Sequence, residues 1–176
     1  METEQSKTLA ALQVAIQMEI EGKEYYYKAS QNSSNRLGKE LFQSLAAEED
    51  VHRQKFEEIY RTIERKEAWP GTDFQPDGGK RLRTIFIEVT EAMDSDVEVL
   101  ATELDAVKTA MDIENKTHDY YKTQSQAATY AAERDFFELL AAEEREHHLV
   151  LLDYYEFLKD PAAWFVQKEH PSLDAG

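Results

Sequence analysis

No cysteine occurs among the 176 residues of this chain. Disulfide bonds, catalysis by a thiolate, iron–sulfur clusters and cysteine-ligated zinc are therefore excluded within this sequence. Whatever chemistry these residues support must use other side chains.

Glycine and proline are also scarce, with six and four residues respectively. Two of the prolines and three of the glycines fall within residues 69–79, so the rest of the chain is nearly free of helix-breaking residues. This distribution favours long helices over a turn-rich β fold. No apolar run is long enough to span a bilayer, and the acidic N-terminus lacks the layout of a signal peptide, so we expect a cytoplasmic protein.

Basic residues are few compared with acidic ones: 20 Lys and Arg stand against 36 Asp and Glu, for a formal charge of −16. A surface of this charge repels nucleic-acid phosphates and anionic lipid headgroups. We therefore expect no nucleic acid and no membrane as partner. Some of the carboxylates could instead be neutralised by bound cations.

Apolar residues recur every three or four positions along most of the chain, which predicts helices. Long helices are expected from near Ser6 or Thr8 to about Gln31, from a cap at Ser34 or Asn35 to about Lys66, from a start between Ser95 and Thr102 to near Gln126, and from a cap at Thr129 to Pro161. A short helix is expected around residues 82–93. We expect one domain over residues 1–176, with helical hairpins at 6–66 and 96–158, a crossover at 67–95 and a tail at 159–176, whose Trp164 and Phe165 dock on the bundle.

The two halves of the chain repeat each other at an offset of 95 residues. The sequence Leu-Ala-Ala-Glu-Glu occurs at 45–49 and again at 140–144. The aligned pairs that carry reactive or metal-binding groups are Glu19 with Glu114, Tyr26 with Tyr121, Glu49 with Glu144, and His52 with His147. A hairpin used twice predicts an all-α four-helix bundle with pseudo-twofold symmetry, its halves joined by the long crossover.

Four glutamates of this repeat interrupt helix faces that are otherwise apolar. Most glutamates on helices face solvent, but Glu19 lies among Leu12 and Ile16, where a core is expected. Burying an unpaired carboxylate costs several kcal/mol, whereas two divalent cations would neutralise four carboxylates. Each Glu-x-x-His pair places an imidazole on the same helix face as its carboxylate, and oxygen with nitrogen ligands favours iron or manganese. The predicted metal ligands are Glu19, Glu49, His52, Glu114, Glu144 and His147.

Glu48 and Glu143 directly precede the two predicted ligands of the Glu-x-x-His pairs. They lie one position off the core-facing stripe of each helix. We therefore expect both to face away from the metals.

On these residues, across residues 8–158, the chain resembles the rubrerythrins of the ferritin-like superfamily. The matching elements are Glu19 with Gly22 and Tyr26, Glu49-Asp50-Val51-His52, Glu114 with Tyr121, and Glu144-Arg145-Glu146-His147. The resemblance implies a ferritin-like bundle with a non-haem di-iron site, in which Glu49 and Glu144 bridge the metals while Glu19 and Glu114 are terminal ligands. It also implies reduction of hydrogen peroxide, or oxidation of Fe(II), at that site.

Two features depart from the family pattern. Rubrerythrins typically carry a cysteine-ligated rubredoxin domain that delivers electrons, so an external electron-donor protein is expected here. They also have a further glutamate three residues after the third-helix ligand, where this chain has Thr117. The site is thus similar to the more symmetric four-glutamate, two-histidine type of bacterioferritins, which favours Fe(II) oxidation.

Three functions remain as hypotheses: a di-iron oxidoreductase acting on hydrogen peroxide or O2, a ferroxidase that handles Fe(II), and a non-catalytic helical scaffold with a relic metal site. The expected cofactor is two Fe ions, with Mn or a mixed pair as the alternative. Tyr26 and Tyr121 are either core aromatics or hydrogen-bond donors to the ligand carboxylates that offer a redox-active phenol. Family analogy implies a homodimer, in which helices can be exchanged between subunits.

Overall fold

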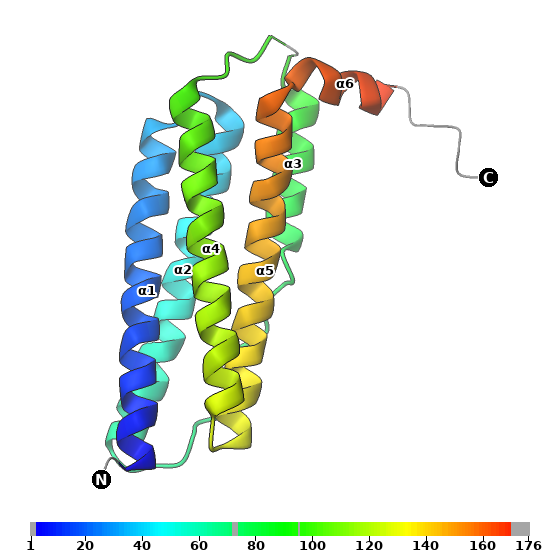
Figure 1. The fold of residues 1–176 in the computed structure, drawn as a ribbon. Helices are drawn as coiled ribbons and strands as arrows, with labels where there is room; N and C mark the ends of the chain where they lie inside the picture. Colours follow the sequence, from blue (N-terminus) through cyan, green and yellow to red (C-terminus); the bar gives the residue numbers. More distant parts are fainter. Residues whose placement is uncertain (1–2, 72–73, 95, 170–176) are drawn as a thin grey trace, which may run out of the picture.

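The computed structural model describes residues 3–71, 74–94 and 96–169, and every regular element in these ranges is an α-helix. The elements are α1 Glu4–Asn32, α2 Arg36–Glu64, α3 Lys80–Ala92, α4 Ala101–Ala127, α5 Ala131–Lys159 and α6 Pro161–Glu169 (Figure 1). The all-α class predicted from the sequence is therefore confirmed.

The four long helices pair as two antiparallel hairpins, α1 with α2 and α4 with α5. The crossover returns the chain to the opposite end of the bundle before α4 begins, so α4 runs antiparallel to α1 and α5 runs antiparallel to α2 (Figure 1). The short helix α3 packs against α2 and α5. The crossover thus covers the α2–α5 side of the bundle, and no second crossover exists in the described ranges to cover the α1–α4 side.

The helix starts use different caps. The Asn35 side chain accepts a hydrogen bond from the amide of Gly38 at 2.9 Å and caps α2, as one of the two predicted alternatives. The predicted cap of α5 at Thr129 is wrong, because Tyr130 occupies the cap position without a side-chain bond. The Thr129 hydroxyl instead donates to a carboxylate oxygen of Glu4 at 2.5 Å, since the start of α1 lies beside it in the bundle.

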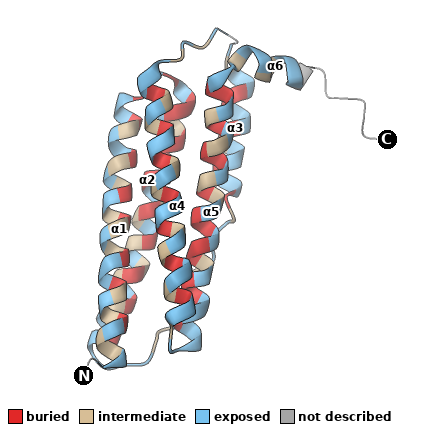
Figure 2. Ribbon diagram, in the orientation of Figure 1, coloured by how far each residue is buried: buried red, intermediate tan, exposed pale blue. Residues whose placement is uncertain are grey.

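Buried side chains line the inner faces of all four long helices (Figure 2). They form two apolar clusters, one containing Tyr26 and the other containing Tyr121. The first also holds Phe42 and Tyr154, and the second holds Phe56. Full burial of each such aromatic contributes roughly 1.5–3 kcal/mol, so both clusters stabilise the bundle.

Helix α6 packs against the end of the bundle through two aromatic side chains. Pro161 is the first residue of α6. Proline is well tolerated at the first position of a helix, because its missing N–H would have no partner there. The Trp164 ring packs edge-on against Phe86 with centroids 5.4 Å apart, and Phe165 packs on Phe157 at 6.0 Å. The expected docking of these two aromatic residues is therefore observed. None of the helices in the described ranges combines the length and hydropathy needed to cross a bilayer.

Candidate metal centre

Each long helix places one glutamate near its middle and on its buried face, and α2 and α5 each add a histidine one turn later. All six side chains are at most 2% exposed. They come from three pairs at the repeat offset, and we refer to them together as the centre residues: Glu19, Glu49, His52, Glu114, Glu144 and His147. The structure thus brings together, inside one bundle, the six residues that the sequence predicted as ligands.

One half of the centre is built around His52, and we call it the His52 position. The Nδ1 atom of His52 lies 3.3 Å from a carboxylate oxygen of Glu144, 3.5 Å from one of Glu19 and 4.0 Å from one of Glu49. One potential ligand atom from each of these four residues lies within 4.8 Å of all the others. This spacing suits a single ion held by three carboxylates and one imidazole.

The other half, which we call the His147 position, repeats this geometry. The Nδ1 atom of His147 lies 3.3 Å from Glu49, 3.5 Å from Glu114 and 3.7 Å from Glu144. The two imidazole rings stack with centroids 5.7 Å apart and an interplanar angle of 6°. Glu49 and Glu144 belong to both positions, so their carboxylates lie where they can be shared between two ions.

The inner atoms of the centre have no hydrogen-bond partners in the described residues. Nine buried side-chain atoms lack such a partner, and seven of them belong to the centre residues, including Nδ1 of both histidines and both oxygens of Glu144. Buried polar atoms are normally satisfied, so a group of seven unsatisfied atoms facing one another indicates a missing ligand. Carboxylate oxygen and imidazole nitrogen are suitable donors for iron or manganese, so the residues fit a pair of such ions.

Burial and mutual repulsion perturb the titration of the centre. Burial and the neighbouring carboxylates raise the pKa of Glu49 well above its usual range and that of Glu144 to about 8. Burial alone would raise the pKa of Glu114, but the adjacent Glu144 carboxyl, the charge of His147 and the Tyr26 hydroxyl hold it below its usual value. The carboxylates outweigh burial at His52 and His147 and raise both imidazole pKa values. Without metal, protons must therefore compensate the charge.

Two tyrosines join the hairpins at the centre. The Tyr26 hydroxyl of α1 donates a short hydrogen bond to Glu114 of α4, and the Tyr121 hydroxyl of α4 donates one to Glu19 of α1. Burial and the adjacent carboxylates raise both tyrosine pKa values well above 10, so the phenols keep their protons. Each tyrosine is both a core aromatic and a donor to a centre carboxylate, and the two interpretations left open by the sequence do not exclude each other.

A glycine leaves space for one of the shared carboxylates. A Cβ atom built on Gly22 would lie 2.7 Å from Oε2 of Glu49. The repeat places Thr117 at the equivalent point of the other hairpin, where its hydroxyl donates to the Ile113 carbonyl at 3.0 Å within α4. Thr117 is buried, so no carboxylate stands where rubrerythrins have their additional glutamate.

The expectation that Glu48 and Glu143 simply face away is wrong in one respect. Glu48 of α2 reaches across to α5, where its Oε2 lies 2.8 Å from Nε2 of His147, and a carboxylate oxygen of Glu143 lies within 4.8 Å of both imidazoles. Glu143 of α5 is only 4% exposed. A position one residue off the core stripe points toward the neighbouring helix when that helix lies close, and α2 and α5 are close here. The identity of both residues across the repeat could have indicated this role.

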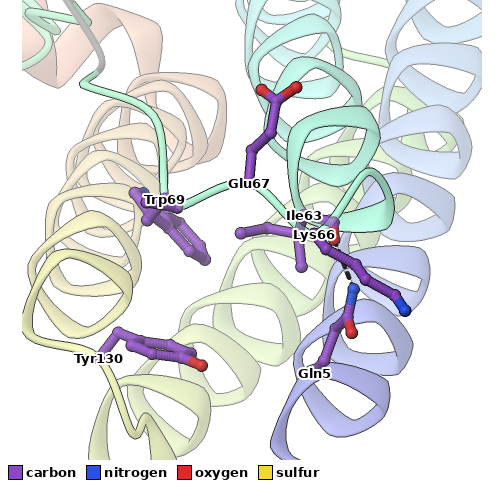
Figure 3. A pocket seen from close by; sticks show the side chains of 7 residues that line it. Gln5, Ile63, Lys66, Glu67, Trp69 and Tyr130 are labelled. Atoms are coloured by element: carbon purple, nitrogen blue, oxygen red, sulfur yellow. Dashed lines mark hydrogen bonds between the residues drawn. The ribbon is translucent and has the colours of Figure 1, made fainter.

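A second hollow in the surface has different chemistry. The groove in Figure 3, of about 240 Å³, is lined by Gln5, Ile63, Lys66, Glu67, Ala68, Trp69 and Tyr130. It contains no centre residue, and its one carboxylate and one amine are on the loop after α2. The groove therefore offers no set of ligands comparable with the centre.

Comparison with known families agrees with this geometry. The sequence model of the rubrerythrin family matches residues 10–106, which include most of α1, all of α2 and α3, and the start of α4. Comparisons with curated proteins and with solved structures gave no match. The matched family is one of di-iron carboxylate proteins with oxidoreductase activity, and the buried carboxylate and histidine cluster has the residues to bind metal.

Proposed function

Because this chain belongs to the rubrerythrin family, we propose that it is a di-iron oxidoreductase that reduces hydrogen peroxide, or O2, at the centre. The observation that carries the proposal is the set of seven unsatisfied buried atoms on six converging side chains. In this proposal Glu49 and Glu144 would be shared by the two ions, Glu19 and His52 would complete one position, and Glu114 and His147 would complete the other.

Two ferrous ions at the centre would supply the two electrons needed to cleave an O–O bond. The protein residues hold the ligands and keep bulk water out, since every centre residue is nearly fully buried. The Tyr26 and Tyr121 hydroxyls orient the terminal carboxylates Glu114 and Glu19 and hold a proton beside each. Electrons for the next turnover come from a redox site outside these residues, because they include no cysteine for a rubredoxin-type site.

A second candidate function is oxidation of Fe(II) as a substrate. Thr117 supports it, because a buried threonine replaces the additional glutamate of rubrerythrins and leaves a symmetric set of four glutamates and two histidines. With this set, the same residues would bind incoming Fe(II) and release the oxidised product to iron storage or transport.

Metal analysis and stopped-flow absorbance test these functions in turn. The purified chain, reconstituted with Fe(II) without oxygen, should bind two ions; fewer than about one per chain would contradict both functions and favour the scaffold hypothesis. The di-ferrous protein is then mixed with peroxide or with O2. Oxidation much faster with peroxide is expected for the peroxidase, and oxidation faster with O2 would favour the ferroxidase.

A further inference from the structure

The pseudo-twofold symmetry of the centre is broken at the outer sides of its histidines. Glu48 of α2 contacts Nε2 of His147 at 2.8 Å. Glu143 is the equivalent residue of α5, and exact symmetry would place it on Nε2 of His52. Glu143 instead has no hydrogen-bond partner among the described residues, although only 4% of its surface is exposed.

The crossover lies on this side of the bundle and encloses a pocket beside His52. The Phe74 ring packs edge-on against the His52 ring, with centroids 5.8 Å apart and an interplanar angle of 89°. The pocket has a volume of about 160 Å³, which is enough for a cation with part of its hydration shell. Its lining residues are Glu48, Val51, His52, Phe74, Gln75, Pro76, Asp77 and Glu143.

Three of the lining residues are acids, and neither lysine nor arginine is among them. Asp77 is held in place by the start of α3, because its carboxylate accepts hydrogen bonds from the amides of Gly79 at 2.9 Å and Arg81 at 3.1 Å. Glu143 lies close enough to Glu48 and Asp77 to feel the charge of both. The basic side chain of Arg83 on α3 is bound elsewhere, to Glu146 at 2.7 Å.

We propose that this pocket is the uptake site for divalent metal, in which Glu143 holds the cation before it passes His52 into the centre. Ligand atoms of Glu143, His52 and His147 lie within 4.8 Å of one another, so a cation bound by Glu143 meets an imidazole directly. His52 separates the two compartments: its ring lines the pocket, and its Nδ1 faces Glu144 at 3.3 Å.

The charge of the pocket selects among the possible solutes. Three carboxylates attract a divalent cation, whereas neutral peroxide and O2 gain nothing from that charge, and anions are repelled. The Glu143 carboxylate lines this pocket and has no hydrogen-bond partner among the described residues that would compete with a bound cation. The inference rests on the proposed function, because uptake has meaning only if the centre binds metal.

The test measures metal loading of the metal-free full-length chain with Co²⁺, whose absorbance changes when it enters the centre. Stopped-flow mixing gives the loading rate, and equilibrium titration gives the number of ions bound. In Glu143→Gln we expect the rate to fall about tenfold while two ions still bind with unchanged final absorbance. The matched control is Glu138→Gln, which removes the same charge from an exposed position on the same helix and should load like the unaltered protein.

Each outcome separates this inference from the proposed function. If the unaltered chain binds no Co²⁺ or Fe²⁺, the proposed function itself fails. If it binds two ions and Glu143→Gln loads as fast as Glu138→Gln, uptake through this pocket is excluded and the proposed function stands. If Glu143→Gln changes the number of ions or their final absorbance, Glu143 supports the ligands instead, which also overturns the inference.

Discussion

The two histidines of the centre have the same sequence context and nearly parallel rings, but different surroundings. His147 is fixed on both sides, by carboxylates at Nδ1 and by Glu48 at Nε2. His52 has the equivalent inner carboxylates, with Glu19 in place of Glu114, but it also meets Phe74 and an acidic pocket. The repeat builds two equivalent ligand sets. The single crossover places an acidic pocket beside His52, whereas the outer nitrogen of His147 is bound by Glu48.

This difference has a physical origin in connectivity. Two copies of a hairpin can be related by a twofold axis, but the one segment that joins them cannot obey that symmetry. The crossover must cover one side of the bundle, and here it covers the side formed by α2 and α5, the two helices that carry the histidines. Glu48 and Glu143 are equivalent in the repeat, but the crossover gives them different surroundings, so their roles can differ.

The largest expected effect comes from the carboxylates that both positions share. Replacing Glu49 or Glu144 with Ala should abolish binding of both ions, because each position loses a ligand. Glu19→Ala is the matched comparison: it affects the His52 position alone, so one ion should remain at the His147 position. Elemental analysis after dialysis checks both results, and two ions in Glu49→Ala would refute the shared assignment.

The second effect concerns stability without metal. The pKa of Glu144 in the folded protein is raised to about 8 from an ordinary value of 4.5, so the folded state binds more protons than the unfolded state between these pH values. The raised pKa values of Glu49 and of both histidines act in the same direction, and the lowered pKa of Glu114 opposes them. The free energy of unfolding should therefore fall by about a few kcal/mol as pH rises from 5 to 8.

Urea unfolding in the presence of a chelator measures this dependence. Glu144→Gln removes one of the titrating groups and should make the pH profile less steep. Saturating metal should raise stability more at pH 8 than at pH 5, because fewer protons must be displaced from the centre at the higher pH. Stability that rises with pH in the metal-free protein would contradict the sign worked out from these pKa shifts.

The third prediction compares the outer sides of the histidines directly. Glu48→Ala removes the acceptor that fixes the His147 ring, and supporting residues of this kind typically change metal affinity by about 10–100-fold. We expect that loss at one of the two ions, seen by competition with a chelator. Glu143→Ala should leave both equilibrium affinities unchanged. Equal losses in the two variants would mean that the histidines are not supported differently.

The smallest effect is expected at Gly22, where the hairpins also differ. In Gly22→Ala the new methyl group would lie 2.7 Å from Oε2 of Glu49, so the carboxylate must shift and metal affinity should fall a few-fold. The metal-free protein should gain about 0.5–1 kcal/mol, since alanine favours helix over glycine. A Cβ atom at Gly71 would have no other atom within 4 Å, so Gly71→Ala is the control for metal affinity. Unchanged metal affinity in Gly22→Ala would show that the Glu49 carboxylate can shift without weakening metal binding.

Local chemistry was readable from the sequence because it depends on spacing within one helix. Glu-x-x-His puts a carboxylate and an imidazole on one face, and Asn35 caps the helix that it precedes. The predicted cap at Thr129 is wrong because its hydroxyl donates to Glu4, which is distant in sequence. Glu48 was misread for the same reason, since its partner His147 belongs to the other hairpin.

The sequence by itself determined the all-α class, the repeat and the six residues that converge at the centre, because periodicity and a fixed offset leave few alternatives. Only the tertiary structure decided how the halves meet: Tyr26 bonds Glu114 and Tyr121 bonds Glu19, so each phenol supports the opposite hairpin. It also decided which histidine faces the acidic pocket, because that depends on the path of the crossover across the bundle. A pattern along one helix does not specify which neighbour lies against it.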